Sequence, residues 1–454
     1  MEQTCSRGIH TQSRCLIHLF ATTCRRLLPG ERAYRGSSDK CIPEGGRAMN
    51  NARASRIVEM FEQRGEDFHA LVCRTPQNVV MLTGYQPILG NTFCIVTVNK
   101  AREVEVRLAV PEDEEDRVPR GAAVEVKTFA EETMDYIGNT IQAVREPLAE
   151  LLRSAHVNEN PVIGYEGIYS PIATAYTQVG APGPATLDLL HKLFLGGYLV
   201  DATSMFDELA AVKTEEEIDF IRRCEEVGRQ GFMAAREAVR VGATEADVAA
   251  ATYASLLRAG YAAPGANHVL PHVHVMAGPR AAMAYKAFNL TSNRPIAHGD
   301  TVTVQMEIGI NGHWAELTRT FFAGTISDEW RKAHEACVAA QDAALQVIRD
   351  GAAAREADGA ARSIMAKAGF GPAFKHGLGH GFGFQAINHA AAPVLHPASD
   401  AVLRSGMVHN MEPAVYLEGK GGIRLNDNVA VRQDGNEVLS SQLPRDLDWL
   451  VVAG

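Results

Sequence analysis

The stretch TVTVQMEIGINGHWAELTRTF, residues 301–321, decides how the second half of this chain folds. An Asn-Gly dipeptide at 311–312 suits the positive backbone angles of a tight hairpin turn. A two-residue loop there pairs Glu307 directly with Glu316, and Gln305 lies on the same face because strand side chains alternate. Two carboxylates about 5 Å apart repel unless a cation or a shared proton lies between them. The hairpin is therefore predicted to hold something positive, the alternative being an edge hairpin with solvated glutamates.

Three further stretches carry chemical groups that suit the same site. They are HGLGHGFG (376–383), with two histidines in a glycine-dense loop, GMVHNMEP (406–413), with a lone carboxylate after an apolar run, and GGIRLND (421–427), a turn into a strand. Together with ELTRTF (316–321), this order resembles the pita-bread superfamily of creatinase, prolidases, Xaa-Pro aminopeptidases and methionine aminopeptidases. The resemblance implies an α+β fold, in which an α/β N-terminal domain of creatinase type precedes a pita-bread domain with a curved antiparallel sheet flanked by helices.

Composition limits the classes of partner. The chain has 454 residues, 46% hydrophobic and 22% charged, which is enough for two domains with ordinary cores. Its net charge of −10 and the lack of a long basic run argue against nucleic acid or an anionic membrane as a partner. No apolar stretch approaches the roughly 20 residues of a membrane span. Cysteines beyond residue 48 are scattered without CxxC pairs, which favours reduced thiols in the cytoplasm.

The pattern along the chain predicts three parts. Residues 1–48 hold half of the eight cysteines and no periodic apolar pattern, so they are interpreted as a non-native or disordered extension. They are either a transit-like segment or untranslated sequence before a start at Met49. Residues 49–207 are predicted to form the creatinase-type N-terminal domain, and 208–454 the pita-bread catalytic domain.

Local patterns predict the individual elements. In the first domain we expect helices at 52–64, 132–155 and 186–196, and strands at 69–73, 93–98, 104–110, 162–165 and 198–202. In the second we expect helices at 214–241, opened by a TEEE capping box, at 244–259, stopped by Gly260, at 327–350, and at 353–368, stopped by Gly369.

The resemblance also implies a set of metal-ligand positions. Metallopeptidases of the superfamily hold two metal ions with Asp, Asp, His, Glu and Glu, and these positions fall here on Gln305, Glu316, His380, Glu412 and Asn426. Two bridging carboxylates have thus become amides, which bind hard cations weakly and cannot offset the repulsion of two nearby metals. We therefore expect no dinuclear metal centre and no required cofactor. The set leaves room for one divalent ion (Mn, Zn, Co or Fe) on Glu307, Glu316, His380 and Glu412.

Creatinase departs from the metal-ligand set in a similar way, and it binds a substrate guanidinium between its retained carboxylates. The position of the catalytic histidine of creatinase is Tyr285 here, and a phenol with a pKa near 10 is a poor base. His272 and His274 are further candidates for that base. The predicted catalytic residues are His380, Glu316, Glu412, His376, His389 and Tyr285, and the predicted substrate-binding residues are Glu307, Gln305 and Arg424.

Three functions stay open at this point. The first is a creatinase-like hydrolase that cleaves a C–N bond in a small polar nitrogen compound without a dinuclear metal centre. The second is a metal-dependent Xaa-Pro dipeptidase or aminopeptidase, and the third is a non-catalytic pita-bread binding protein. The expected substrate is a small molecule or a dipeptide. The resemblance further implies a homodimer in which each N-terminal domain covers the partner's site.

Overall fold

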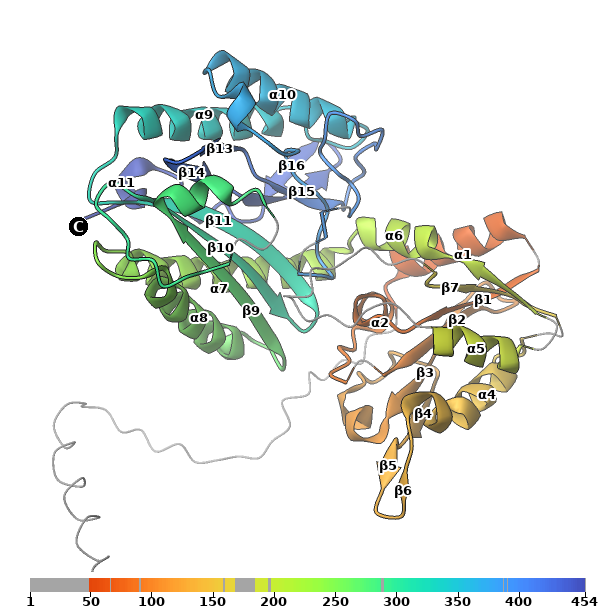
Figure 1. Ribbon diagram of the computed structural model, residues 1–454. Helices are drawn as coiled ribbons and strands as arrows, with labels where there is room; N and C mark the ends of the chain where they lie inside the picture. The colour runs from red at the N-terminus through yellow and green to blue at the C-terminus, as the bar shows by residue number, and fades with distance from the viewer. Residues whose placement is uncertain are drawn as a thin grey trace, which may run out of the picture. The chain divides into compact units, whose positions relative to one another are not determined.

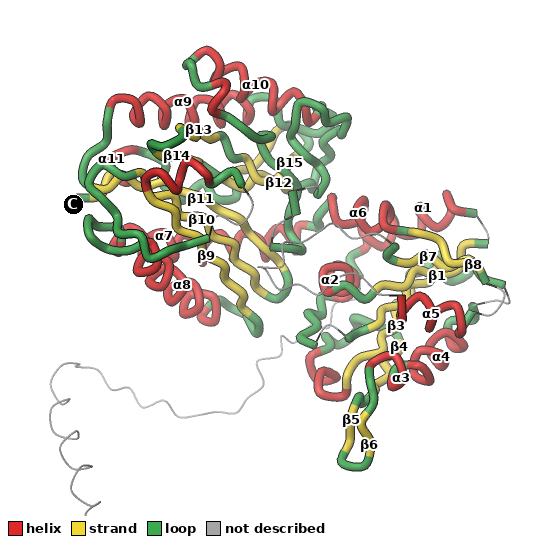
Figure 2. Tube along the Cα trace, viewed as in Figure 1, coloured by secondary structure: helices red, strands yellow, loops and turns green. Residues whose placement is uncertain are grey.

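The computed structural model describes residues 49–453, apart from 66, 90, 158–159, 168–183, 195–196, 287–289, 387 and 390. The predicted extension, 1–48, lies outside these residues, and its interpretation stays a prediction. The boundary placed between 207 and 208 also stays a prediction. Figure 1 labels the helices and strands, and Figure 2 distinguishes them by colour.

The first half of the chain builds a six-stranded sheet in the order β4-β3-β2-β1-β7-β8. Strand β1 pairs antiparallel with β2 and parallel with β7. Alternate residues of β1 enter different hydrophobic clusters, Leu71 and Cys73 on one face and Ala70 and Val72 on the other. A sheet buried on both faces needs helices on both sides, which confirms the predicted α/β layering. The strands are β1 (Phe68–Cys73), β2 (Phe93–Val98), β3 (Val104–Pro111), β4 (Glu125–Phe129), β7 (Val162–Tyr165) and β8 (Tyr198–Asp201), and the helices include α1 (Asn51–Arg64), α2 (Pro76–Thr83), α5 (Pro184–Leu193) and α6 (Thr203–Ala211).

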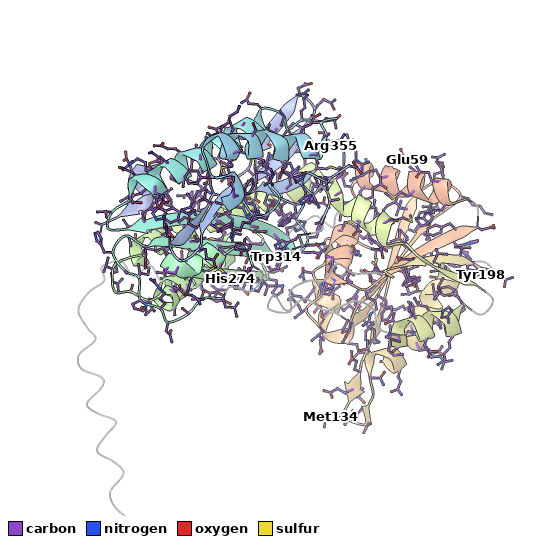
Figure 3. The ribbon with its side chains drawn as sticks, turned by 45° about the horizontal axis from the view of Figure 1, so that its top comes forward. Glu59, Met134, Tyr198, His274, Trp314 and Arg355 are labelled. Atoms are coloured by element: carbon purple, nitrogen blue, oxygen red, sulfur yellow. The ribbon has the colours of Figure 1, made fainter. Side chains whose placement is uncertain are left out.

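The long helix predicted at 132–155 is wrong. The segment instead forms a small hairpin of β5 (Glu132–Thr133) and β6 (Tyr136–Ile137), followed by α3 (Thr140–Ala143) and α4 (Arg145–Ser154). Pro147 lies in the first turn of α4, where its missing N–H is tolerated, whereas a continuous helix would place it in the interior. Met134 is fully exposed at the hairpin tip, where Figure 3 labels it.

The second half of the chain contains the predicted hairpin. Strands β10 (Thr301–Ile310) and β11 (His313–Ala323) pair antiparallel with Glu307 opposite Glu316, so the predicted register is confirmed. The turn residues Asn311 and Gly312 have φ angles of 50° and 80°, as a type I′ turn requires. Strand β9 (Val269–Ala277) pairs with the other edge of β10, and β17 (Val451–Val452) pairs with β11.

Helices α7 (Glu215–Ala238) and α8 (Glu245–Ala262) lie along this sheet, as Figure 1 shows. The predicted capping box at the start of α7 is confirmed, with Thr214 and Glu217 bonded reciprocally. The predicted stop at Gly260 is wrong, because α8 continues past it. A Cβ atom at Gly260 would lie 2.5 Å from Cγ1 of Val269, so this glycine allows the helix to approach β9 closely.

Shorter strands and a second pair of helices complete the fold. Helix α9 ends at Leu345 rather than near 350, because the side-chain amide of Asn436 donates to the carbonyl groups of Leu345 and Ile348. In the part of the chain that the structure describes, every helix is too short or too polar to span a bilayer. The remaining elements are α9 (Asp328–Leu345), α10 (Ala354–Lys367), β12 (Val408–Met411), β13 (Ala414–Leu417), β14 (Gly421–Arg424), β15 (Asp427–Arg432), β16 (Gly435–Val438) and α11 (Leu447–Leu450).

Candidate active site

One face of the β9–β10–β11 sheet carries a row of polar side chains. Gln305 is paired with His274 of β9, and Glu307 is paired with His272 on one side and Glu316 on the other. Side chains of directly paired residues point to the same face of a sheet. The sheet therefore brings two carboxyl groups, an amide and two imidazoles together, and Figure 3 labels His274 among these side chains.

The second half of the domain adds groups from three separate segments. An isolated bridge between Thr318 and Asn426 ties the start of β15 to β11. His380 comes from the glycine-rich loop, and its backbone N–H donates to the side-chain oxygen of Asn410 at 2.7 Å. Glu412 follows β12, and Arg424 ends β14. All of these side chains are buried.

Burial raises the pKa values of the three carboxyl groups, and the nearby Glu316 adds to the rise for Glu307 and Glu412. Burial raises the pKa of Glu316 to about 7, while Arg424 and Asn410 act in the opposite direction. The pKa of Glu412 is also raised to about 7, by burial and to a smaller extent by Glu316. For Glu307, burial and the nearby Glu316 raise the pKa well above its usual range. At neutral pH this cluster therefore holds protons as well as charges.

Arg424 supplies the positive charge that the paired glutamates were predicted to need. Its Nη2 donates to Oε1 of Gln305, and its Nη1 lies 3.6 Å from Oε2 of Glu412. Gln305 in turn donates from Nε2 to Oε1 of Glu307 at 2.7 Å. Burial alone would lower the pKa of Arg424, but Tyr416 and the three carboxyl groups outweigh it and raise the pKa above its usual value. The three predicted substrate-binding residues thus make hydrogen bonds to one another.

The hydrogen bonds of His380 define which ring nitrogen carries the proton. Nδ1 lies 3.0 Å from the carbonyl oxygen of Gly381, which only accepts, so Nδ1 carries the proton in that bond. Nε2 then accepts from Nδ2 of Asn410 at 3.1 Å. Burial lowers the pKa of His380, so the ring is neutral at pH 7. Its Nε2 lies 3.6 Å from Oε2 of Glu316, close enough to exchange a proton after a small movement.

His376 is fully engaged in the structure. Its Nδ1 lies 2.7 Å from the carbonyl oxygen of Gly377, and its Nε2 lies 3.0 Å from the hydroxyl oxygen of Tyr416. Burial lowers the pKa of His376 to about 3. With both nitrogens hydrogen-bonded and so low a pKa, this ring orients Tyr416 more readily than it accepts a proton from water.

The other two predicted catalytic residues border the cluster. The ring of Tyr285 lies 5.3 Å from that of Tyr416, and Nζ of Lys375 lies 4.8 Å from the Tyr285 centroid. The ring of His389 lies 5.1 Å from that of His380. Burial and His380 lower the pKa of His389 to about 4, which leaves it neutral at pH 7.

Two residues of the cluster were missed by the sequence analysis. Asn410 contacts both His380 and Glu316, and Tyr416 contacts His376. Asn410 could have been found from the sequence, because it precedes Glu412 by two positions and an extended strand places such residues on one face. Tyr416 had no comparable signal, since it follows a proline and a change of strand.

The residues present do not fit a dinuclear metal centre. Asn426 donates from Nδ2 to Oε1 of Glu316 at 3.4 Å, and Gln305 is bonded to the guanidinium of Arg424. Both amides therefore act on neighbouring charges where the superfamily pattern has carboxylates. Among the described residues, no group of three or more His, Cys, Asp or Glu side chains is arranged to hold a metal ion. Binding of a single divalent ion stays a prediction.

Comparison with known proteins defines the family. Residues 219–433 match the model of metallopeptidase family M24. The Xaa-Pro dipeptidase of Lactobacillus helveticus is 30% identical over 268 residues, which cover 58% of this chain and 70% of that protein. The Xaa-Pro dipeptidase of Pyrococcus horikoshii is 24% identical over 86% of this chain and 97% of its own length. The crystal structure of a prolidase from the same organism superposes with a TM-score of 0.70 at 23% identity, covering 87% of this chain and all of that one.

The chain belongs to the metallopeptidase family M24. The predicted pita-bread superfamily and two-part fold are thereby confirmed. The chain is a hydrolase that acts on C–N bonds, as predicted. Its similarity to Xaa-Pro dipeptidases favours the second of the three predicted functions over the first.

Proposed function

We propose that this protein hydrolyses the C–N bond of a small dipeptide-like substrate, the class of compound named in its Xaa-Pro dipeptidase relatives. The observation that carries the proposal is the buried pair of Glu316 and Glu412, each with a pKa of about 7, beside His380. Groups that titrate near the working pH are the most effective in proton transfer.

Amide hydrolysis needs one group to accept a proton and another to donate one. Water adds to the carbonyl carbon as it loses a proton, and the C–N bond breaks as the nitrogen gains one. Neighbouring carboxyl groups favour states in which one is ionised and the other protonated. In this mechanism, the ionised member of the Glu316–Glu412 pair takes the proton from water and the protonated member gives one to the leaving nitrogen.

The contacts of Arg424 argue against the creatinase-like alternative. That alternative needs Glu316 and Glu412 to bind a positively charged substrate. Here Arg424 already lies 3.6 Å from Glu412 and stabilises the ionised form of both carboxyl groups. A neutral amide therefore suits this site better than a second guanidinium, because two cations would compete for the same carboxylates.

The test is a substrate panel applied to the full chain and to matched variants. Xaa-Pro dipeptides, other dipeptides, creatine and amidines are assayed with and without added Mn²⁺. We expect Xaa-Pro dipeptides to be cleaved, and Glu316→Gln and Glu412→Gln each to lower kcat/KM about a hundredfold. Glu418→Gln alters an exposed glutamate near β13 and should leave kcat/KM unchanged.

Two results would contradict the proposal. Cleavage of creatine or an amidine, with no cleavage of any dipeptide, would restore the creatinase-like alternative. Unchanged turnover in both glutamine variants would remove Glu316 and Glu412 from the reaction. The predicted homodimer and cytoplasmic location are separate proposals, and light scattering of the purified protein tests the first of them.

A further inference from the structure

The charge balance of the site carries an inference beyond the proposed reaction. Three carboxyl groups, Glu307, Glu316 and Glu412, are 0%, 1% and 7% exposed. Buried carboxylates are costly unless a cation or hydrogen-bond donors compensate them. Nε2 of His380 lies 3.1 Å from Nδ2 of Asn410, and Nη1 of Arg424 lies 3.6 Å from Oε2 of Glu412. The compensation therefore comes from this one guanidinium together with nearby amides.

Gln305 holds that guanidinium in a way that no carboxylate could. A side-chain amide has an acceptor oxygen and a donor nitrogen, and here the oxygen accepts from Arg424 while the nitrogen donates to Glu307. An aspartate at 305 would have no N–H for Glu307 and would add a like charge beside it. The side-chain amide of Gln305 thus links the guanidinium of Arg424 to the carboxyl group of Glu307.

Asn410 and Asn426 likewise donate hydrogen bonds from their side-chain amides to Glu316. Their Nδ2 atoms lie 3.3 and 3.4 Å from its two carboxyl oxygens. Each carboxyl oxygen of Glu316 therefore accepts from one side-chain amide. The departures from the superfamily pattern form a coherent set, since each one donates to a carboxylate or holds the cation.

We propose that Arg424 is a built-in cation that takes the charge-balancing place of the metal ions in this site, with Gln305 as its positioning residue. Nε of Arg424 is buried and has no hydrogen-bond partner among the described residues. This N–H is thus available to a carbonyl oxygen of the substrate, on which negative charge develops as water adds. That catalytic part rests on the proposed function, whereas the charge-balancing part can be tested without turnover.

The first experiment measures binding of Mn²⁺ and Zn²⁺ to the full chain by calorimetry and by elemental analysis after gel filtration. We expect Arg424→Met to bind either metal about tenfold or more tightly than the unaltered protein, because a fixed positive charge no longer opposes the ion. Arg424→Lys should stay close to the unaltered protein. Arg432→Met, which removes a partly buried arginine of the same half of the chain that pairs with Glu437, should not gain metal affinity.

A second substitution covers the case in which Arg424→Met does not fold. Gln305→Leu removes the amide that holds Arg424 without adding a metal ligand, so it too should raise metal affinity. The proposal is overturned if the unaltered protein already binds a stoichiometric metal ion tightly, or if neither substitution raises metal affinity. Either result stands whether or not a substrate is known.

The catalytic part has its own readout. Arg424→Ala should lose turnover of the best dipeptide and recover part of it with added methylguanidine, but not with Mn²⁺. Recovery with Mn²⁺ alone would show that a metal ion, and not Arg424, stabilises the negative charge that develops on the substrate. If the unaltered protein cleaves no dipeptide, the proposed function fails while the metal-binding result still decides the role of Arg424.

Discussion

Two clusters of buried charge lie on opposite faces of β11, one around Glu316 and one around Arg319. Arg319 donates to Asp427 at 2.7 Å and to the carbonyl oxygens of Pro444 and Leu443 at 2.9 and 3.1 Å. Asp427 also accepts from Ser440 at 2.6 Å, so this ion pair has one cation, one anion and a full set of hydrogen bonds. The Glu316 cluster has three carboxyl groups for one guanidinium.

The difference separates a structural cluster from a reactive one. No polar side-chain atom of Arg319, Asp427 or Ser440 is buried without a partner, whereas Oε2 of Glu307 and Nε of Arg424 have none among the described residues. Unsatisfied buried atoms cost stability, so these two atoms of the Glu316 cluster are candidates for contact with a bound molecule. The contrast shows that one face of β11 can contribute to stability while the other face carries the reactive groups.

Breaking the structural cluster should have the largest effect on stability. Arg319→Met leaves Asp427 buried without its cation, and removal of one partner from a buried pair costs about 3–5 kcal/mol. Urea unfolding followed by circular dichroism measures the change. A loss below about 1 kcal/mol would mean that Asp427 is satisfied by its other donors, and the two faces would then differ less than we infer.

Removing a carboxyl group from the reactive cluster should raise the stability of the protein, whereas breaking the structural cluster lowers it. The pKa of Glu412 is raised to about 7 in the folded protein, against an ordinary value of 4.5. The folded state therefore holds the extra proton, and stability falls as pH rises from about 4.5 to about 7. At pH 8 we expect Glu412→Gln to be more stable than the unaltered protein by on the order of 2–3 kcal/mol, and therefore to have a higher Tm. At pH 4 the two proteins should have similar Tm values.

Thermal unfolding of both proteins across this pH range checks that prediction. Glu418→Gln is the exposed control and should show no such dependence. If Glu412→Gln is instead less stable than the unaltered protein at pH 8, the attraction between Arg424 and the Glu412 carboxylate outweighs the cost of burying that charge.

The smallest effect is expected at the edge of the structural cluster. Ser440→Ala removes the hydroxyl that donates to Asp427, and a single hydrogen bond to a charged group contributes about 1.5–3 kcal/mol, the lower end being appropriate where other donors stay. The free energy of unfolding should fall while kcat/KM stays unchanged. A change in kcat/KM would show that the two faces of β11 are coupled.

The parts of the fold that sequence predicted best are those fixed by local chemistry. Asn311-Gly312 determined the turn, and with it the opposition of Glu307 and Glu316. The capping box at Thr214 determined where α7 begins. The failures at 132–155 and at Gly260 have a common cause, because both depend on where a segment packs rather than on its own pattern.

The candidate site was predictable in its members but not in its contacts. The positions of Glu316, His380 and Glu412 followed from their motifs. That Arg424 turns inward to Gln305 depends on how β14 crosses β10 and β11, which no local pattern records. For the same reason, the sequence suggested a positive partner for the glutamates without identifying it as part of the chain.

The turn at Asn311 has a consequence for how this protein can change over time. Its side chain accepts from the backbone N–H groups of Asn267 and His268 and donates to the carbonyl oxygen of Gly265, which fastens the turn to the start of β9. Because strand faces alternate, a loop longer by one residue would turn Glu316 toward the apolar side and Leu317 toward the polar one. An insertion in this loop during evolution would therefore disrupt the fold and the chemistry together.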